Sequence, residues 1–337
     1  MTFAHNNNMK KKYLLLIPIV ILFIISIIYL PNNLKIKQII WCFLGLLICF
    51  IITKIKYKKI LKYSLIYYLI SIFLLVLVLV LNRFINGSRG WINFGIFSFQ
   101  PSELMKISLI LFTIKYYNKL NLWTLIIIYL IPMILIFLEP DTGAILIEGI
   151  ILLYFLFKKL NKKQIKHLFI FISILLLIII SLYLYDKDIL IKIVGPSIFY
   201  RLDRISKFLN DDSIQTTNAL ISIATGKTLY FPEMFNDFFI AYILSKNIIL
   251  IIPIILSTIS ILVLLKRKNT TISQVAFYLI LFQCYWNLAM NLKLVPVIGI
   301  PYLFLSYGGS HIITSMILIG LVINEKLNIN SMDNNKV

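Results

Sequence analysis

The sequence has few of the residues from which metal sites and disulfide frameworks are built. Only three cysteines occur among its 337 residues, and all three lie inside apolar segments. Their spacing matches no metal site, and three cysteines cannot all form pairs. We therefore interpret Cys42, Cys49 and Cys284 as small core residues, which argues against a disulfide-stabilised domain.

Acidic residues are also scarce. The chain carries 13 aspartates and glutamates against 33 lysines and arginines, which gives a formal net charge of +20. On a soluble protein this charge would suggest nucleic-acid binding. That role needs a folded basic domain, and the one loop long enough to hold it, residues 186–237, is nearly balanced in charge. No nucleic-acid partner is therefore expected.

Apolar residues, by contrast, make up 60% of the chain, whereas a soluble domain rarely exceeds half. The sequence predicts an all-α polytopic membrane protein with about ten transmembrane helices. The first apolar run lacks a small-residue cleavage site, so we expect it to stay as a helix. The predicted spans lie near residues 13–30, 36–53, 60–81, 101–116, 121–138, 142–157, 167–185, 238–265, 272–292 and 304–324.

The distribution of basic residues predicts the topology. Lys10, Lys11 and Lys12 precede the first span, and basic clusters fill alternate loops at 54–62, 115–120, 158–166 and 266–268. Cytoplasmic loops carry such an excess, so both termini are expected in the cytoplasm, with the basic loops touching anionic membrane lipid.

This topology predicts one transmembrane domain over residues 1–325 and a disordered cytoplasmic tail over 326–337. A large extracytoplasmic loop, 186–237, joins helices seven and eight. Loops of this length are usually functional or disordered, and the aromatic content of this one indicates order, as short helices on the bilayer surface.

The first polar motif on the outer side is NGSRGWINFGIFSFQPSELMK, residues 86–106. Glu103 and Lys106 are spaced i, i+3 near a helix start and can pair on one face. They are either a structural ion pair or a charged wall of a substrate cavity. Arg89 is available to bind an anion such as a phosphate.

The second motif is LEPDTGAILIEG, residues 138–149, with Glu139 and Asp141 flanking a proline. Glu148 lies seven residues after Asp141, on roughly the same helix face and within the membrane. An acid at this depth suggests function. Asp141 can also serve as a helix N-cap, and the two roles can coexist.

The third motif is VPVIGIPYLFLSYGGSHI, residues 295–312. Its adjacent glycines, with the hydroxyls of Ser306 and Ser310, permit either close helix packing or an unwound turn that faces a ligand. His311 alone is more typical of a hydrogen-bonded core histidine than of a ligand-binding one.

The fourth motif spans YRLDRISKFLNDD and TGKTLYFPEMFNDF, residues 200–212 and 225–238. Arg201, Arg204 and Lys227 can face a polyanion, although TGKT lacks the strand and earlier glycine of a phosphate-binding P-loop. Asp237 lies among aromatic residues at the start of the eighth span. It is either a general base, because partial desolvation favours that role, or the N-cap of the span.

Two classes of function remain from the residues alone. One is an enzyme that acts at the outer leaflet on a lipid-linked, anionic substrate. The other is a transporter, which should show inverted repeats and broken helices in matching halves. The polar motifs gather on one side and the halves do not match, which favours chemistry at the outer face.

NGSRGWINFGIFSFQPSELMK, EPDTG and PVIGIPYLFLSYGGS, in this order, resemble motifs of the RodA/FtsW/SpoVE family of shape, elongation, division and sporulation proteins. The resemblance covers roughly residues 80–325. It implies a peptidoglycan glycosyltransferase that polymerises lipid II into a nascent glycan strand, for cell shape or division, at the bacterial cytoplasmic membrane. It also implies a class B penicillin-binding protein as the crosslinking partner.

The resemblance also assigns roles to residues. The family's essential aspartate lies in a pattern close to PE…TDF, which here reads PEMFNDF and falls on Asp237, with Asn236 in place of threonine. The family's paired glutamate and lysine match Glu103 and Lys106, and its arginine before a tryptophan matches Arg89. The stretch ALISIATGKTL, 219–229, departs from the family's longer glycine-rich pattern, and only Gly226 and Lys227 match.

In the implied reaction, Asp237 takes the proton from the 4-hydroxyl of an acceptor N-acetylglucosamine. That oxygen attacks the anomeric carbon of the donor's N-acetylmuramic acid and inverts it. The departing undecaprenyl diphosphate needs positive charge, from Arg89, Arg201, Arg204, Lys227 or a divalent cation such as Mg²⁺ or Mn²⁺. The alternatives are a lipid II flippase and a non-catalytic scaffold for the penicillin-binding protein.

Overall fold

The structure is a computed structural model that describes residues 13–81, 90–93, 95, 98–185, 206, 208 and 213–333. Within these residues the regular secondary structure is helical except for one antiparallel hairpin, in which Ile92 of β1 (Ile92–Asn93) lies opposite Phe99 of β2 (Ser98–Phe99). The helices are η1 (Tyr13–Leu15), α2 (Leu16–Tyr29), α3 (Asn32–Lys54), α4 (Tyr57–Lys62), α5 (Ser64–Leu81), α6 (Pro101–Tyr116), α7 (Leu122–Leu138), α8 (Thr142–Lys159), α9 (Lys162–Tyr185), α12 (Ile214–Thr225), α13 (Phe239–Lys246), η2 (Ile248–Leu250), α14 (Ile251–Lys268), α15 (Thr271–Asn291) and α16 (Gly309–Asp333).

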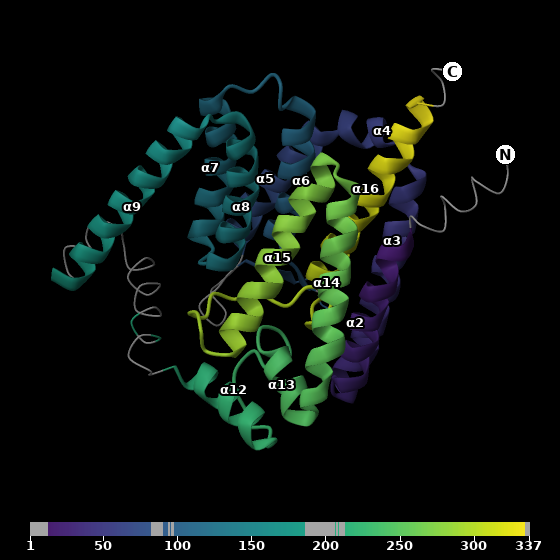
Figure 1. The fold of residues 1–337 in the computed structure, drawn as a ribbon, viewed down its shortest axis with the longest axis vertical. Helices are drawn as coiled ribbons and strands as arrows, with labels where there is room; N and C mark the ends of the chain where they lie inside the picture. Colours follow the sequence, from purple (N-terminus) through teal and green to yellow (C-terminus); the bar gives the residue numbers. More distant parts are fainter. Residues whose placement is uncertain are drawn as a thin grey trace.

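Most of the long helices run along one direction of the molecule, as Figure 1 shows, with α4 at one end and α12 and α13 at the other. α15 and α16 lie in the interior of this bundle. α16 packs against α3, α6 and α15, whereas α15 also packs against α8 and α14. α9 projects at one edge of the bundle (Figure 1).

The contact between α3 and α16 is close because both helices carry glycine where they meet. A Cβ atom on Gly320 would lie 3.0 Å from the backbone oxygen of Cys49, and one on Gly45 would lie 2.9 Å from Met316. Small residues let helix backbones approach in an apolar setting, where van der Waals packing replaces the hydrophobic effect. This packing fixes α16, whose first turn carries part of the site described below.

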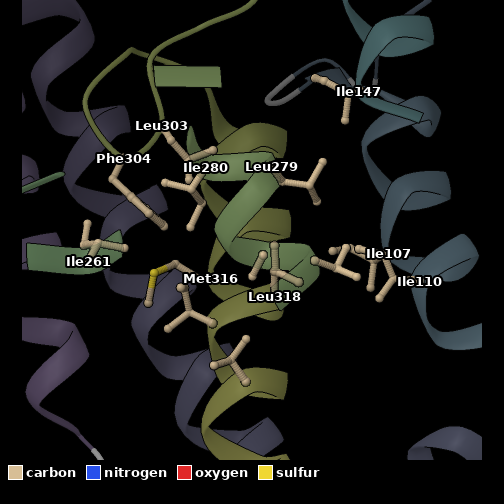
Figure 2. Close-up of a cluster of buried hydrophobic side chains, with 14 of the residues drawn as sticks. Ile107, Ile110, Ile147, Ile261, Leu279, Ile280, Leu303, Phe304, Met316 and Leu318 are labelled. Atoms are coloured by element: carbon tan, nitrogen blue, oxygen red, sulfur yellow. The ribbon is translucent and has the colours of Figure 1, made fainter. Parts of the chain in front are cut away.

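The apolar core lies between α6 and α8 on one side and α14 on the other. Figure 2 shows side chains of α15 and α16 at its centre, joined by residues of the loop that precedes α16. The labelled members are Ile107, Ile110, Ile147, Ile261, Leu279, Ile280, Leu303, Phe304, Met316 and Leu318.

The structure confirms an all-helical protein with several apolar helices of membrane length. Among the described residues, Asn32–Lys54, Ser64–Leu81 and Ile248–Lys268 are long and apolar enough to cross a membrane, and Tyr13–Tyr29, Leu122–Leu138 and Gly309–Glu325 are apolar but shorter. Large hydrophobic side chains on these helices face outward, such as Phe43 and Phe73. The count of ten spans and the location of the termini stay predictions.

The eighth predicted span, 238–265, is not one helix. It consists of α13, the short η2 and α14, and the chain is extended at Asn247, between α13 and η2. The side chain of Asn247 accepts a hydrogen bond from the backbone nitrogen of Ile249 at 3.1 Å. An asparagine that satisfies a local backbone donor competes with helix continuation, which explains the break.

The bounds of two other spans also differ from the prediction. The third span is divided at Tyr63 into α4 and α5. The last helix starts at Gly309 rather than near 304, because Phe304 has a left-handed backbone with φ of 63°. It then continues to Asp333, whereas the sequence predicts a disordered tail from residue 326. Helix propagation from a long, packed segment adds residues at little cost, which explains the extension.

Part of the predicted outer loop, 186–237, is described. It contains α12, which ends at Gly226 in the left-handed conformation with φ of 68°. A short helix in this loop was predicted, and its position on the bilayer surface stays a prediction. Residues 186–205, 207 and 209–212 lie outside the described residues.

Candidate active site

A polar cavity of about 570 Å³ lies where several helices begin. Its wall includes the β1–β2 hairpin, the start of α6, the start of α8 and the turn before α13. The segment before α16 and its first turn contribute Ile298, Gly299, Pro301, Tyr307, Gly308, Gly309 and His311. α3 contributes Lys37 and Trp41. The cavity brings together residues from four of the motifs identified in the sequence.

The first turn of α6 supplies a buried ion pair. The Nζ atom of Lys106 lies 2.7 Å from Oε2 of Glu103, as the i, i+3 spacing predicts, and the hydroxyl of Thr314 donates to the same oxygen. Glu103 lines the cavity, whereas Lys106 lies behind it. A carboxylate in the first turn is also stabilised by the positive end of the helix dipole.

Asp141 is the N-cap of α8, which was one of the two roles predicted for it. Its Oδ1 atom accepts a hydrogen bond from the backbone nitrogen of Ala144 at 2.9 Å. Its Oδ2 atom accepts a second from Nε2 of Gln100 at 2.6 Å, which ties α8 to the hairpin side of α6. Asp141 also lines the cavity, so the capping role leaves a substrate role open.

Asp237 lines the same cavity and is 7% exposed. It lies in a turn that is closed by a hydrogen bond from the backbone nitrogen of Phe238 to the backbone oxygen of Glu233. The N-cap of α13 is Phe238, so the alternative in which Asp237 caps the span is not found. The ring of Phe238 packs edge-on against Phe231, which holds the turn on an apolar base.

Two asparagines that the sequence analysis did not consider position this turn. The side-chain nitrogens of Asn287 and Asn291 on α15 donate to the backbone oxygen of Asp237 at 2.7 and 3.0 Å. Both asparagines are completely buried. The available signal was the pattern NLAMN, which places two amides four residues apart on one face of an apolar helix.

A close backbone approach forms another part of the wall. A Cβ atom on Gly143 would lie 2.8 Å from the backbone oxygen of Gly299, and Gly299 itself is left-handed with φ of 71°. A Cβ atom on Gly299 would lie 3.7 Å from Oδ2 of Asp237. The start of α8, the loop before α16 and the Asp237 turn therefore meet at a point where only glycine fits.

The other predicted residues lie in different places. Ser306 and Ser310 do not line the cavity: Ser306 accepts from the backbone nitrogen of Tyr302, and Ser310 bonds the backbones of Ser98 and Gln100. Lys227 is exposed beyond the end of α12 and outside the cavity wall. Arg89, Arg201 and Arg204 lie outside the described residues. Substrate contacts for these residues stay predictions.

The adjacent glycines before α16 show the close-packing alternative. A Cβ atom on Gly309 would lie 2.6 Å from the indole of Trp41 on α3. His311, in the next turn of the chain, lines the cavity rather than the core. Its Nδ1 atom lies 3.8 Å from Oε1 of Glu103, so the ring faces the buried ion pair.

A family model described as "Cell cycle protein" for FtsW, RodA and SpoVE matches residues 9–330. The chain belongs to the FtsW/RodA/SpoVE family. It is 30% identical over 331 residues to the probable peptidoglycan glycosyltransferase FtsW of Wigglesworthia glossinidia brevipalpis, covering 85% of this chain and 82% of that protein. It is 27% identical over 330 residues to the stage V sporulation protein E of Bacillus subtilis, covering 86% and 85%.

Solved structures show the same fold for this FtsW/RodA/SpoVE member. A chain from a peptidoglycan synthase complex, described as coordinating polymerization and crosslinking, superimposes with a TM-score of 0.78 at 21% identity, covering 93% of this chain and 97% of that one. A variant of the rod shape determining protein RodA of Thermus thermophilus gives a TM-score of 0.66 at 18% identity, covering 94% and 97%.

A divalent cation was a candidate for this FtsW/RodA/SpoVE site. Among the described residues, no three histidine, cysteine, aspartate or glutamate side chains gather closely enough to hold a metal ion. The carboxylates of the cavity wall have other contacts, such as the capping bonds of Asp141.

Proposed function

We propose that this chain is a peptidoglycan glycosyltransferase of the FtsW/RodA type, which polymerises lipid II at the outer face of the bacterial cytoplasmic membrane. The observation that carries the proposal is the placement of Asp237 in the cavity wall, nearly buried and anchored through its backbone. The relatives named as probable peptidoglycan glycosyltransferases support the same reaction for this chain.

Asp237 is the proposed general base. Its carboxylate would accept the proton of the 4-hydroxyl of an acceptor N-acetylglucosamine, while that oxygen attacks the anomeric carbon of the donor N-acetylmuramic acid. The bond from this carbon to the diphosphate breaks, so the configuration inverts and undecaprenyl diphosphate leaves. A base acts well only when it is held within hydrogen-bond reach of its proton, and the two amides of α15 fix the backbone of Asp237 for this purpose.

Glu103 and Asp141 are proposed to contact the sugar and peptide groups of the substrate. Both line the cavity with Asp237, and both are held by hydrogen bonds from other side chains. Lys106 neutralises Glu103 from behind, which prevents repulsion of the substrate's diphosphate. Arg89, Arg201, Arg204 and Lys227 stay candidates for contacts to that diphosphate.

The proposed partner is a class B penicillin-binding protein that crosslinks the product. One structural relative belongs to a peptidoglycan synthase complex that couples polymerization to crosslinking. The partner would dock on the apolar outer surface of the helices within the membrane. Lipid II, the nascent glycan strand and membrane lipid complete the proposed set of contacts.

Polymerisation of labelled lipid II tests the proposal. The full chain, purified with and without its penicillin-binding protein, should give glycan ladders on a gel, and Asp237→Asn should give none. Asp333→Asn makes the same chemical change at the far end of α16 and should leave the ladders unchanged. Ladders from folded Asp237→Asn would refute the base.

The same samples separate the alternatives. If the protein is a flippase, the wild type would move lipid II across proteoliposome membranes without forming polymer. A scaffold would form no polymer. In that case the Asp237→Asn protein would stimulate the penicillin-binding protein as well as wild type does. Either pattern would replace the glycosyltransferase proposal.

A further inference from the structure

His311 is a buried side chain that the proposed reaction does not yet use. It is 5% exposed and lines the polar cavity from the first turn of α16. Nε2 has no hydrogen-bond partner among the described residues, and Nδ1 has only the carboxylate of Glu103 at 3.8 Å. Burying a polar group without a partner destabilises a protein, so a group aimed into a cavity in this state points to a ligand that supplies the partner.

The surroundings of His311 indicate the charge of that ligand. The ring stands at the amino-terminal end of α16, where the helix dipole and unbonded backbone amides favour an anion. The nearest carboxylate, Glu103, lies 3.8 Å from Nδ1 and is already neutralised by Lys106 at 2.7 Å. Lys37 of α3 lines the same cavity and adds a further positive charge.

The contact with Glu103 leaves Nε2 free to act as a donor. Nδ1 lies 3.8 Å from Oε1 of Glu103, beyond hydrogen-bond distance, so the neutral ring can carry its proton on Nε2. Because His311 lines the cavity, that donor is available to a ligand inside it.

We infer that His311 and the amino-terminal end of α16 form the subsite that holds the diphosphate of the lipid-linked donor. The inference rests on the proposed function and names the residue that contacts the leaving group. The bond between the anomeric carbon and the diphosphate oxygen breaks with its electron pair on the oxygen, and the acceptor's proton goes to Asp237. His311 transfers no proton and stabilises the developing negative charge by donating a hydrogen bond.

The other charged or titratable groups that face this part of the cavity from the described elements are Lys37 on α3, Glu103 and Lys106 on α6, Asp141 at the start of α8, Glu233 and Asp237 before α13, and Tyr307.

Chemical labelling of the wild-type full chain tests the inference without a variant. Diethyl pyrocarbonate modifies histidine, and mass spectrometry of peptides distinguishes His311 from His167, which is exposed on α9. Inorganic diphosphate should slow the modification of His311 and leave that of His167 unchanged. Equal modification of His311 with and without diphosphate would overturn the inference.

Calorimetric binding of inorganic diphosphate adds a second measurement. His311→Gln should bind about tenfold more weakly than wild type, which corresponds to the loss of a hydrogen bond to a charged group. His311→Lys keeps a donor at this position and should bind tightly. His167→Gln is the matched control and should behave as wild type. The same affinity for wild type and His311→Gln would refute the subsite.

The phosphate of an ordinary phospholipid shares this chemistry. If phosphatidylglycerol in the micelle protects His311 as well as diphosphate does, the subsite holds a membrane headgroup and the inference is wrong. These results stand apart from the ladder assay. A wild-type protein that polymerises lipid II but does not bind diphosphate would refute only the subsite. Ladders from Asp237→Asn would refute only the role of Asp237 as the base.

Discussion

Asn287 on α15 donates hydrogen bonds from Nδ2 to the backbone oxygen of Asp237 and to that of Ile300, each at 2.7 Å. One amide therefore joins the turn that carries the proposed base to the loop on the other side of it. Asn291, one turn further along α15, makes a second bond to Asp237 and accepts from the backbone nitrogen of Ala241. The position of the base thus depends on an interior helix that contributes nothing to the cavity wall.

Asn287→Ala should lower kcat for lipid II polymerisation about 100-fold while KM changes little, because a small displacement of a catalytic group is sufficient for such a loss. It should also destabilise the protein by about 1–3 kcal/mol, since the backbone oxygen of Ile300 loses this donor and that of Asp237 keeps only the bond from Asn291. Ladder kinetics and thermal unfolding in detergent measure the two effects.

The matched control for this prediction is Asn218→Ala, which removes a half-buried asparagine that donates to the backbone oxygen of Tyr230 at 3.3 Å. It should leave both kcat and the unfolding midpoint close to those of wild type. Normal polymerisation by Asn287→Ala would mean that the turn holds Asp237 without help from α15.

Lys106→Met should destabilise the protein by about 3 kcal/mol, because it leaves Glu103 buried without its counter-charge. The double change Lys106→Met with Glu103→Gln should recover most of that stability, since the isolated charge is then gone. It should not recover polymerisation, because Glu103 lines the cavity. A double-mutant cycle on unfolding midpoints and ladder rates separates the two roles. Full activity of the double variant would show that the pair is only structural.

The limits of α6, one ion pair and one helix cap could be predicted, because each depends on residues that are close together in the sequence. α6 runs over Pro101–Tyr116, as predicted, because a proline at the first position and a lysine near the end mark its limits. The Glu103–Lys106 pair and the Asp141 cap likewise follow from spacing within one helix. The break at Asn247 was missed, although Ser245, Lys246 and Asn247 interrupt the apolar run there, because no Gly or Pro marks the position.

The rest of the site could not be predicted because it depends on contacts between distant parts of the chain. The bond from Asn287 to Asp237 joins residues 50 positions apart, and His311 meets Glu103 only because α16 packs against α6. From the sequence alone, His311 was interpreted as a hydrogen-bonded core histidine, because a single histidine without a second ligand residue is typical of a core. The lack of a hydrogen-bond partner for its Nε2 atom is a property of the packed structure.

Gly143→Ala should destabilise the protein by about 1–3 kcal/mol, because the new methyl group would meet the backbone of Gly299 and Ile298, which cannot move as a side chain does. The displaced loop lies beside Asp237, so ladder formation should also fall. Gly149→Ala on the same helix is the matched control, since its nearest neighbour would be the end of Met133 at 3.9 Å. It should be neutral or slightly stabilising. Equal behaviour of the two variants would refute the tight approach.

Glu148 and Glu325 make a pair of buried acids for which the same substitution should have opposite effects. Glu148 is 1% exposed on α8, and neither of its carboxylate oxygens has a hydrogen-bond partner among the described residues. Glu325 on α16 interacts with the side chain of Thr270 and the backbone of Ile272, and only its Oε2 atom has no hydrogen-bond partner among the described residues. A buried acid is destabilising when it lacks partners and contributes when it has them.

Glu148→Leu should therefore raise the unfolding midpoint, with a gain of about 1 kcal/mol, whereas Glu325→Leu should lower it by about 1–2 kcal/mol. Polymerisation by Glu148→Leu should match wild type, because Glu148 is not part of the cavity wall. Thermal unfolding in detergent and the ladder assay measure both quantities on the same preparations. A stable Glu148→Leu protein that makes no glycan would show that this acid takes part in the reaction, as acids buried within membrane helices often do.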